Sequence, residues 1–261
     1  MKKNIFILLS SIILTSFIPS SIFAQSNGLS FGIRSGINFS KISNKGDIIG
    51  IPLEDFTNND PSSIKETWLK TKIHFRTTYS IGGFLEYYFN NKYSVILEFI
   101  YNNKGAIFNG EFFYSFIQSG YTLNNLIEIN TTIELNYYSF PIFLKYTFPV
   151  NHKINPYIII GPEIGYISKA KTSKIDWKNT GWFTDNPKSE NKYETNGEDL
   201  KNYVEKIEYV INIGAGISYK TMGINIIFDG RYSMGISNIN KIAKKDILSK
   251  MISLNIGVST N

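Results

Sequence analysis

Residues 209–219 read YVINIGAGISY, and residues 223–236 read GINIIFDGRYSMGI. In both stretches apolar side chains occupy nearly every second position, and most of the positions between them hold glycine, asparagine, serine or a charge. Because successive side chains of a β-strand point to opposite faces, this alternation predicts two strands that are apolar on one face and polar on the other. The short connection around 221–222 predicts a tight antiparallel hairpin.

The same alternation recurs along most of the chain. It predicts further strands over 29–40, 79–89, 93–101, 138–148, 156–168 and 251–258. Long connections, at 41–78, 102–137, 169–208 and 237–250, then alternate with short ones. In an antiparallel sheet every second connection lies at the same end, so all the long loops meet at one end. Outer-membrane barrels show this arrangement, which predicts an all-β fold: an eight-stranded antiparallel up-and-down transmembrane β-barrel with short periplasmic turns and long extracellular loops.

The two faces of the predicted strands differ in chemistry. One is rich in Ile, Leu and Phe and carries no charge; the other is mostly glycine, serine and asparagine with a few charges. Small side chains suit the crowded interior of an eight-stranded barrel, so we expect the polar face inside and the apolar face toward lipid. The interior charges, three basic against four acidic, are predicted to pair as a network: Arg34, Glu86, Glu98, Lys145, Glu163, Asp229 and Arg231.

Aromatic side chains stand at both ends of the apolar face. Tyr and Trp rings favour the membrane–water interface, which predicts two belts. The periplasmic belt would contain Tyr93, Phe148 and Tyr219; the outer belt would contain Tyr79, Tyr101, Tyr138, Tyr166 and Tyr209.

The alternation changes phase near Asn136, because Ile133 and Leu135 share one parity and Tyr138 and Phe140 the other. Two explanations remain open: a β-bulge at this point, or a strand that continues beyond the membrane with its apolar preference reversed. In either case residues 110–117 and 126–135 are candidates for a protruding hairpin.

The first 24 residues predict a cleaved signal peptide. Lys2 and Lys3 precede an apolar stretch over 5–18, and Ala24 is a small residue before the expected cut. An uncleaved membrane anchor is the alternative, although the stretch falls short of the ~20 residues that a membrane helix needs. The chain would therefore be exported, and residues 25–261 would form a single outer-membrane barrel domain located in the cell outer membrane.

Composition narrows the function. The 261 residues include no cysteine, which excludes disulfides, thiolate metal sites and a cysteine nucleophile. The net charge of +6 is too modest to predict a nucleic-acid partner. The only two histidines, His74 and His152, are expected at opposite ends of the barrel, so neither a shared metal site nor a histidine-based catalytic site is predicted. We therefore expect no enzyme, no catalytic or metal-binding residues and no cofactor.

The three tryptophans, Trp68, Trp177 and Trp182, all fall in predicted long loops. They would either pack these loops together or form a contact surface for a partner or ligand.

Several stretches together resemble the PorT-like outer-membrane β-barrel family. They are FGIRSGINFS (31–40), LNYYSFPIFLKYTF (135–148), INPYIIIGPEIGY (154–166), INIGAGISYK (211–220), IIFDGRYSMGISNI (226–239) and LNIGVS (254–259). The resemblance covers nearly all of 29–259 and weakens in the loops. It implies an eight-stranded outer-membrane barrel without catalytic residues or cofactor, and some members are associated with a protein-secretion route across the cell envelope.

These observations predict a barrel whose interior is filled by its own side chains, which disfavours a general diffusion pore. Its role would be that of a membrane anchor, a scaffold or a loop-presenting interaction protein. It would be monomeric, surrounded by outer-membrane lipid, and would contact protein partners through extracellular loops or periplasmic turns. The alternatives are a component of an envelope protein-secretion system, a soluble lipocalin-like carrier, which would need an apolar interior, and a lipid-processing barrel enzyme, for which no Ser/His or His/Asp pair is visible.

Overall fold

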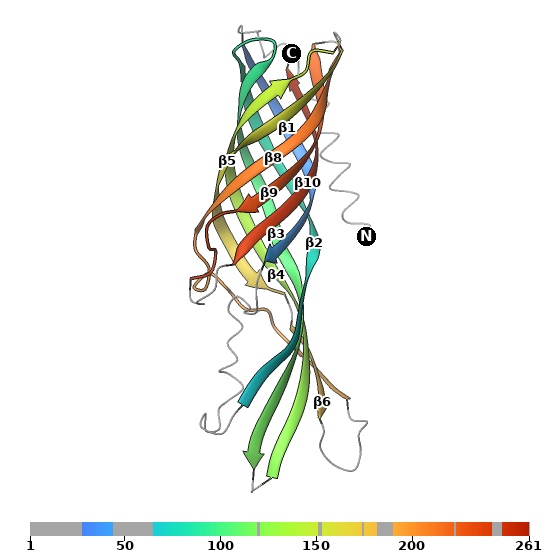
Figure 1. Ribbon diagram of the computed structural model, residues 1–261, viewed down its shortest axis with the longest axis vertical. Coiled ribbons are helices and arrows are strands. Elements are labelled where there is room, and N and C mark those ends of the chain that lie inside the picture. Colours follow the sequence, from blue (N-terminus) through green and yellow to red (C-terminus); the bar gives the residue numbers. More distant parts are fainter. Residues whose placement is uncertain are drawn as a thin grey trace.

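The computed structural model describes residues 28–43, 65–118, 121–150, 153–173, 175–181, 190–221, 223–241 and 247–260. These residues form a single antiparallel sheet that rolls into a barrel (Figure 1). Among them, no helix is long and apolar enough to cross a membrane. The strands are β1 (Leu29–Ser43), β2 (Lys65–Tyr88), β3 (Tyr93–Gln118), β4 (Tyr121–Thr147), β5 (Ile154–Thr172), β6 (Ile175–Gly181), β7 (Glu190–Thr195), β8 (Ile207–Thr221), β9 (Ile224–Gly235) and β10 (Leu248–Thr260).

Closure of the barrel follows from the order of the strands. Neighbours run β3-β2-β1-β10-β9-β8-β5-β4, and a further pairing of β3 with β4 joins the two edges. The first and last strands pair along nearly their whole length, with Ile37 opposite Leu254. Eight strands thus close an up-and-down barrel, which confirms the predicted fold class.

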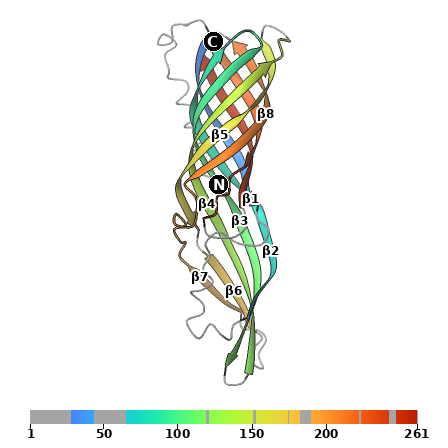
Figure 2. The same ribbon diagram turned by 60° about the vertical axis from the view of Figure 1, so that its left-hand side comes forward.

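The two ends of the barrel differ, as Figures 1 and 2 show. At one end, here called the turn end, lie the short β2–β3 and β8–β9 connections and both termini of the barrel, at Leu29 and Thr260. The β8–β9 turn is tight enough to need Gly223, which has a φ of 84°. The opposite end, here called the loop end, carries the long connections.

Beyond the loop end the sheet continues as a projection that we call the fin. It comprises residues 65–74 of β2, 107–118 of β3 and 121–132 of β4, together with β6, which pairs with β4, and β7, which pairs with β6 (Figures 1 and 2). The prediction of loops over 41–78, 102–137 and 169–208 is therefore wrong in part, because β2 begins at Lys65, β3 and β4 form one long hairpin, and the third connection contains β6 and β7. The placement of Trp68 and Trp177 in loops is wrong for the same reason, since they lie in β2 and β6.

The apolar face of the strands points outward, as predicted. Ile213, for example, is 55% exposed and Leu254 58%, although both lie in the middle of the wall. Along this face, aromatic rings contact one another in both predicted belts: Tyr79 with Tyr101 and Tyr101 with Tyr138 toward the loop end, and Tyr93 with Tyr146 at the turn end. An apolar exterior contradicts a soluble lipocalin-like carrier, whose outer surface would have to be polar.

The change of phase near Asn136 arises because the strand continues beyond the membrane with its apolar preference reversed, which is the second of the two explanations left open above. In β4 the odd-numbered positions are buried without interruption from Ile129 to Lys145, so the strand itself contains no bulge. Its apolar side chains simply turn from the interior at the loop end to the exterior in the membrane band. The register shift lies in β5, where Ser168 is the extra residue and its hydroxyl donates a hydrogen bond of 3.1 Å to the carbonyl of Asn136.

Candidate functional site: the barrel interior

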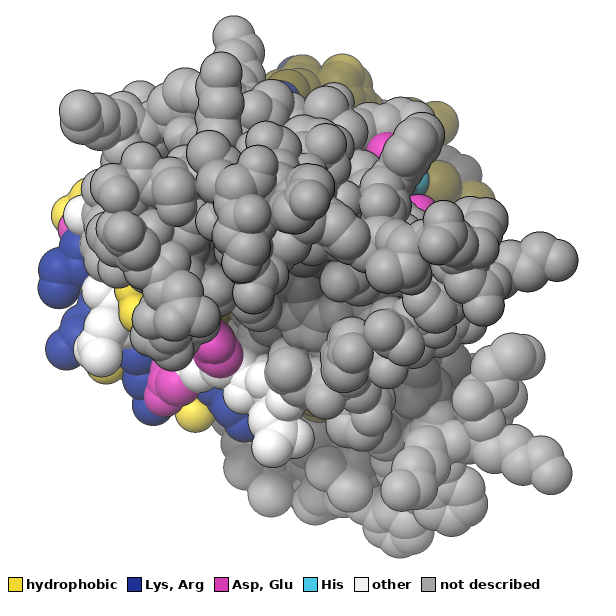
Figure 3. Space-filling view, turned by 90° about the horizontal axis from the view of Figure 1, so that it is seen from below, with side chains coloured by type: hydrophobic (Ala, Val, Ile, Leu, Met, Phe, Trp, Pro, Cys, Tyr) yellow, Lys and Arg dark blue, Asp and Glu magenta, His cyan; other side chains and the backbone are white. Residues whose placement is uncertain are grey.

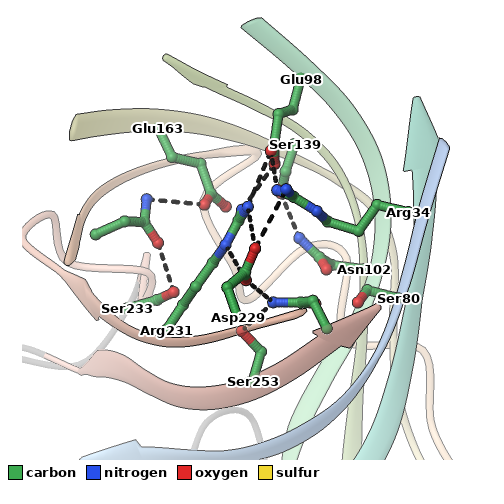
Figure 4. Close-up of polar contacts among 12 residues, drawn as sticks. Arg34, Ser80, Glu98, Asn102, Ser139, Glu163, Asp229, Arg231, Ser233 and Ser253 are labelled. Carbon is green, nitrogen blue, oxygen red and sulfur yellow. Dashed lines mark hydrogen bonds and ion pairs between the residues drawn. The ribbon is translucent and has the colours of Figure 1, made fainter. Parts of the chain in front are cut away.

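Four charged side chains from three sides of the barrel meet at mid-height (Figure 4). Arg34 of β1 forms ion pairs with Glu98 of β3 and, at 3.2 Å, with Asp229 of β9. Arg231 of β9 bonds Glu98 at 2.7 Å and Asp229 at 2.8 Å. Each cation therefore contacts both carboxylates, and all four side chains are nearly inaccessible to solvent. We call this set the ionic layer.

Neutral groups complete the coordination of the ionic layer. Asn255 and the Tyr157 hydroxyl donate hydrogen bonds to Asp229, at 2.8 and 2.9 Å. The Arg34 guanidinium lies 4.9 Å from the ring centre of Phe84, and that of Arg231 lies 4.5 Å from the ring centre of Phe143. Buried ions are tolerated when pairing and hydrogen bonds replace their lost hydration. These contacts supply that replacement from fixed positions on strands.

A second charged group lies nearer the loop end. The Lys104 ammonium is 3.4 Å from both Glu163 and Glu208, and it also lies 4.4 Å from the ring centre of Tyr137. Asn212 donates a hydrogen bond of 3.1 Å to Glu163. The sequence reasoning missed Lys104 and Glu208 because both fall inside segments that were predicted as loops. The inward parity of Lys104, two positions after Asn102, would have found it once β3 was extended.

A third charged pair stands at the turn end. Lys145 bonds Glu86 at 2.9 Å, and the Ser94 hydroxyl donates to the same carboxylate at 2.6 Å. The pair forms the inner wall of a vestibule of about 900 Å³ that opens at the turn end. The rest of this vestibule is lined mainly by amides and hydroxyls, among them Asn90, Asn155, Asn225, Thr147, Ser218 and Ser259.

The seven predicted interior charges thus form three groups. The structure brings Arg34, Glu98, Asp229 and Arg231 together, places Glu163 with Lys104 and Glu208, and places Glu86 and Lys145 apart from both groups. With the two added residues, four basic and five acidic side chains lie inside. The interior therefore contains three separate groups of paired charges and not one continuous network; the ionic layer and the Glu86–Lys145 pair are balanced, whereas Lys104 faces two carboxylates.

Apolar side chains fill the interior at the loop end, which the prediction of a polar inner face did not foresee. Leu200 and Val204, from the β7–β8 connection, and Ile239 and Ile247, from the β9–β10 connection, are almost fully buried. They pack in one cluster with strand residues that include Ile133, Leu135, Tyr137, Ile167 and Ala170. We call this cluster the plug. The apolar pair Leu200 and Val204 in an otherwise polar segment was the available signal.

The family of the chain follows from its sequence as a whole. The family model described as "outer membrane protein beta-barrel domain" matches residues 23–241. The chain belongs to this family. Among curated proteins, none matches the chain.

Solved structures of other outer-membrane proteins are similar to the chain. Neisserial surface protein A (NspA) is 13% identical, with 90% of this chain and 99% of that chain covered and a TM-score of 0.41. The attachment invasion locus protein Ail of Yersinia pestis is 13% identical, with coverages of 90% and 99% and a TM-score of 0.35. OprG from Pseudomonas aeruginosa is 13% identical, with coverages of 91% and 97% and a TM-score of 0.31. At these identities and scores the matches say nothing of what this chain binds or does.

In the interior of this outer-membrane family member, the charges of the ionic layer are all paired with one another. Each carboxylate of the ionic layer is held by an arginine, so none is poised as a free acid or base. In the described residues no group of three or more His, Asp or Glu side chains could hold a metal ion. His74 is exposed on β2, and His152 lies outside the described residues.

The predicted tryptophan contacts belong to the fin. The backbone of Trp68 pairs with that of Phe112, and the backbone of Trp177 pairs with those of Ile129 and Tyr193. Their side chains, and the whole of Trp182, lie outside the described part of the chain.

Proposed function

We propose that the protein is a non-enzymatic outer-membrane anchor, a monomeric barrel that is closed to solutes and holds the fin outside the cell as an interaction surface. The observation that carries the proposal is the filled interior combined with the fin. The ionic layer occupies mid-height and the plug occupies the loop end, whereas β2, β3 and β4 continue well beyond the wall that they help to form. A transport channel would need an open passage through the interior, whereas an anchor needs only an apolar outer surface that contacts lipid.

The proposed orientation rests on the asymmetry of the two ends. Barrels of the outer membrane keep short turns in the periplasm and long connections outside. The predicted signal peptide over 1–24 precedes β1, which starts at the turn end, so export would leave the mature N-terminus in the periplasm. The fin, with Trp68 on β2 and Trp177 on β6, would then face the extracellular medium as the contact surface, and Trp182 stays a predicted contact.

The loop end exposes charged side chains of both signs. Figure 3 views the molecule from this end and shows Lys and Arg side chains gathered along one side. The exposed residues of this region include three lysines and three acidic residues: Lys169, Lys201, Lys206, Glu198, Asp199 and Glu205.

Conductance tests the closed barrel. The purified protein, inserted into a planar lipid bilayer, is expected to give no steady single-channel current at 1 M KCl, whereas a general porin in the same bilayer gives open steps. Steady open steps from the wild-type barrel would contradict the proposal. Protease treatment of intact cells tests the orientation, because cleavage should fall in the fin and spare the turn end.

A second candidate function is a component of an envelope protein-secretion system. It is favoured by the resemblance of the strand motifs to the PorT-like family, and the polar vestibule at the turn end offers a surface to periplasmic partners. Crosslinking through lysines of the turn end in native membranes, followed by purification, separates the two candidates. A stable set of crosslinked envelope proteins supports the secretion role, and recovery of the barrel alone supports the lone anchor.

A further inference from the structure

The outer wall of the barrel contains an apolar groove. Its floor is formed by Ala215 of β8 and Gly230 of β9, which are direct partners across the two strands. Larger side chains flank this floor, and the groove encloses about 690 Å³. The flanking side chains are almost entirely apolar and include Leu144, Tyr146, Ile158, Ile160, Ile213, Tyr232 and Ile252.

The strand register fixes the course of the groove. One row of paired residues runs from Ile252 of β10 through Tyr232, Ile213 and Ile160 to Leu144 of β4. Ile252 lies near the start of β10, at the loop end, whereas Leu144 lies near the last residue of β4, at the turn end. The groove therefore descends obliquely across the wall, from the loop-end side of the membrane band toward the turn end.

Two lysines stand at the loop-end head of the groove. Lys250 occupies the next outward position of β10 before Ile252, and its direct partner on β1 is Lys41. The Lys41 ammonium lies 4.8 Å from the ring centre of Phe75. Among the described residues, neither lysine forms an ion pair with a carboxylate. Like charges directly opposite each other on a sheet are destabilising, so this pairing calls for an anion.

The position of the lysine pair at the edge of the apolar band indicates which anion it would bind. On β1 and β10 the outward positions that lead toward it, including Phe39, Ile37, Ile252 and Leu254, carry no charge. On these two strands Lys41 and Lys250 are therefore the first outward charges met on leaving the apolar band, at the edge where the head group of a lipid in contact with the band would lie. Lysine side chains reach from an apolar surface to such groups, and they are attracted to an anionic membrane surface.

We infer that this wall binds one phosphate-bearing lipid, with its phosphate between Lys41 and Lys250 and an acyl chain along the groove over Ala215 and Gly230. The occupant is a lipid and not a free phosphate, because the basic pair stands one outward position beyond Ile252, which lines the apolar groove. The inference requires only that the barrel sit in a membrane, so it stands apart from the proposed role as an anchor.

Native mass spectrometry of the detergent-solubilised barrel tests the inference. The protein is mixed with phosphatidylglycerol, with phosphatidylcholine or with inorganic phosphate at equal concentration, and the bound adducts are counted. We expect one phosphatidylglycerol to be retained at collision energies that remove phosphatidylcholine, and no retained inorganic phosphate. Lys41→Gln combined with Lys250→Gln should reduce the retained lipid on the order of tenfold, whereas arginine at both positions should preserve it.

Matched variants separate this site from general charge. Lys92→Gln combined with Lys220→Gln removes the same charge from exposed turn-end positions and should leave lipid retention unchanged. Gly230→Leu fills the groove, where a new Cβ meets only Leu254, at 3.7 Å, and should weaken lipid retention while both lysines remain. Each variant is first checked for the mobility shift on heating that marks a folded barrel. Equal retention by the Lys41/Lys250 glutamine variant and the wild type would overturn the inference, as would equal losses in the two glutamine pairs.

Discussion

Leu97 and Glu98 are neighbours on β3, yet they meet opposite environments. Leu97 is 48% exposed on the outer wall, whereas Glu98 is 5% exposed and bonded to two arginines. On the outer face a side chain needs only to be apolar, since lipid makes no directional demands. On the inner face each charge needs a partner from another strand, because no solvent replaces a lost contact. The two faces of one wall should therefore respond to mutation in different ways.

The inner face should show the largest effect. Glu98→Gln removes a charge that Arg34 and Arg231 share, and we expect a loss of about 3–5 kcal/mol in unfolding free energy, since an uncompensated buried cation remains. Urea unfolding of the barrel folded into phosphatidylcholine vesicles measures this loss. Glu205→Gln, at an exposed position between β7 and β8, is the control and should change the free energy by less than about 0.5 kcal/mol. Similar small values for both variants would show that the ionic layer does not stabilise the barrel.

The outer face should respond to charge itself. Ile213→Arg places a cation in the middle of the lipid-facing wall, and we expect a loss of about 2–4 kcal/mol in the same vesicles. Ile213→Leu keeps the site apolar and should behave as wild type. A tolerated arginine would mean that this part of the wall does not face hydrocarbon.

Substitutions at two glycines compare how much space is left for a side chain on the inner and the outer face. A Cβ at Gly161, on the inner face of β5, would collide with the backbone carbonyl of Ile142, so Gly161→Ala should cost about 1–3 kcal/mol. A Cβ at Gly230, on the outer face, has its nearest neighbour at 3.7 Å, and Gly230→Ala should be nearly neutral. Unfolding midpoints of the two alanine variants decide this, and equal midpoints would refute the difference in crowding.

The plug should give the smallest global effect. Leu200 is fully buried, but it belongs to a connection that can open without unpairing any barrel strand. Leu200→Ala is expected to speed proteolysis around 196–206 severalfold while the unfolding free energy of the barrel changes by no more than about 0.5 kcal/mol. A large drop in barrel stability would show that the plug and the strands unfold together.

The barrel itself was readable from local patterns. In segments such as 209–219 every outward position lies within the membrane band. The period of two therefore indicates the strand, its lipid-facing side and its length. The fin could not be predicted, because outward side chains beyond the membrane band no longer need to be apolar. The two faces of a strand then differ less in polarity. Ile133 and Leu135 made this visible as a change of phase, and the sequence left two explanations for it.

The sequence predicts which single charges point into the barrel, but it does not predict how they are grouped. Inward parity marks Arg34, Glu98 and Arg231, yet their contacts join residues 64 and 133 positions apart, and no local pattern encodes such partners. Lys104 and Glu208 escaped because the strands that hold them extend past the predicted ends. The plug could not be predicted because Leu200 and Ile247 belong to connections without a regular hydrophobic period, and only the fold brings them together.

The alternation of side chains by itself determined that this chain forms strands and that its apolar face meets lipid, since both properties depend only on a residue's immediate neighbours along the chain. Only the tertiary structure decided which charges pair, where the wall ends and the fin begins, and what closes the loop end. Those outcomes depend on shear and register between strands, which bring residues from distant parts of the chain to one level of the barrel.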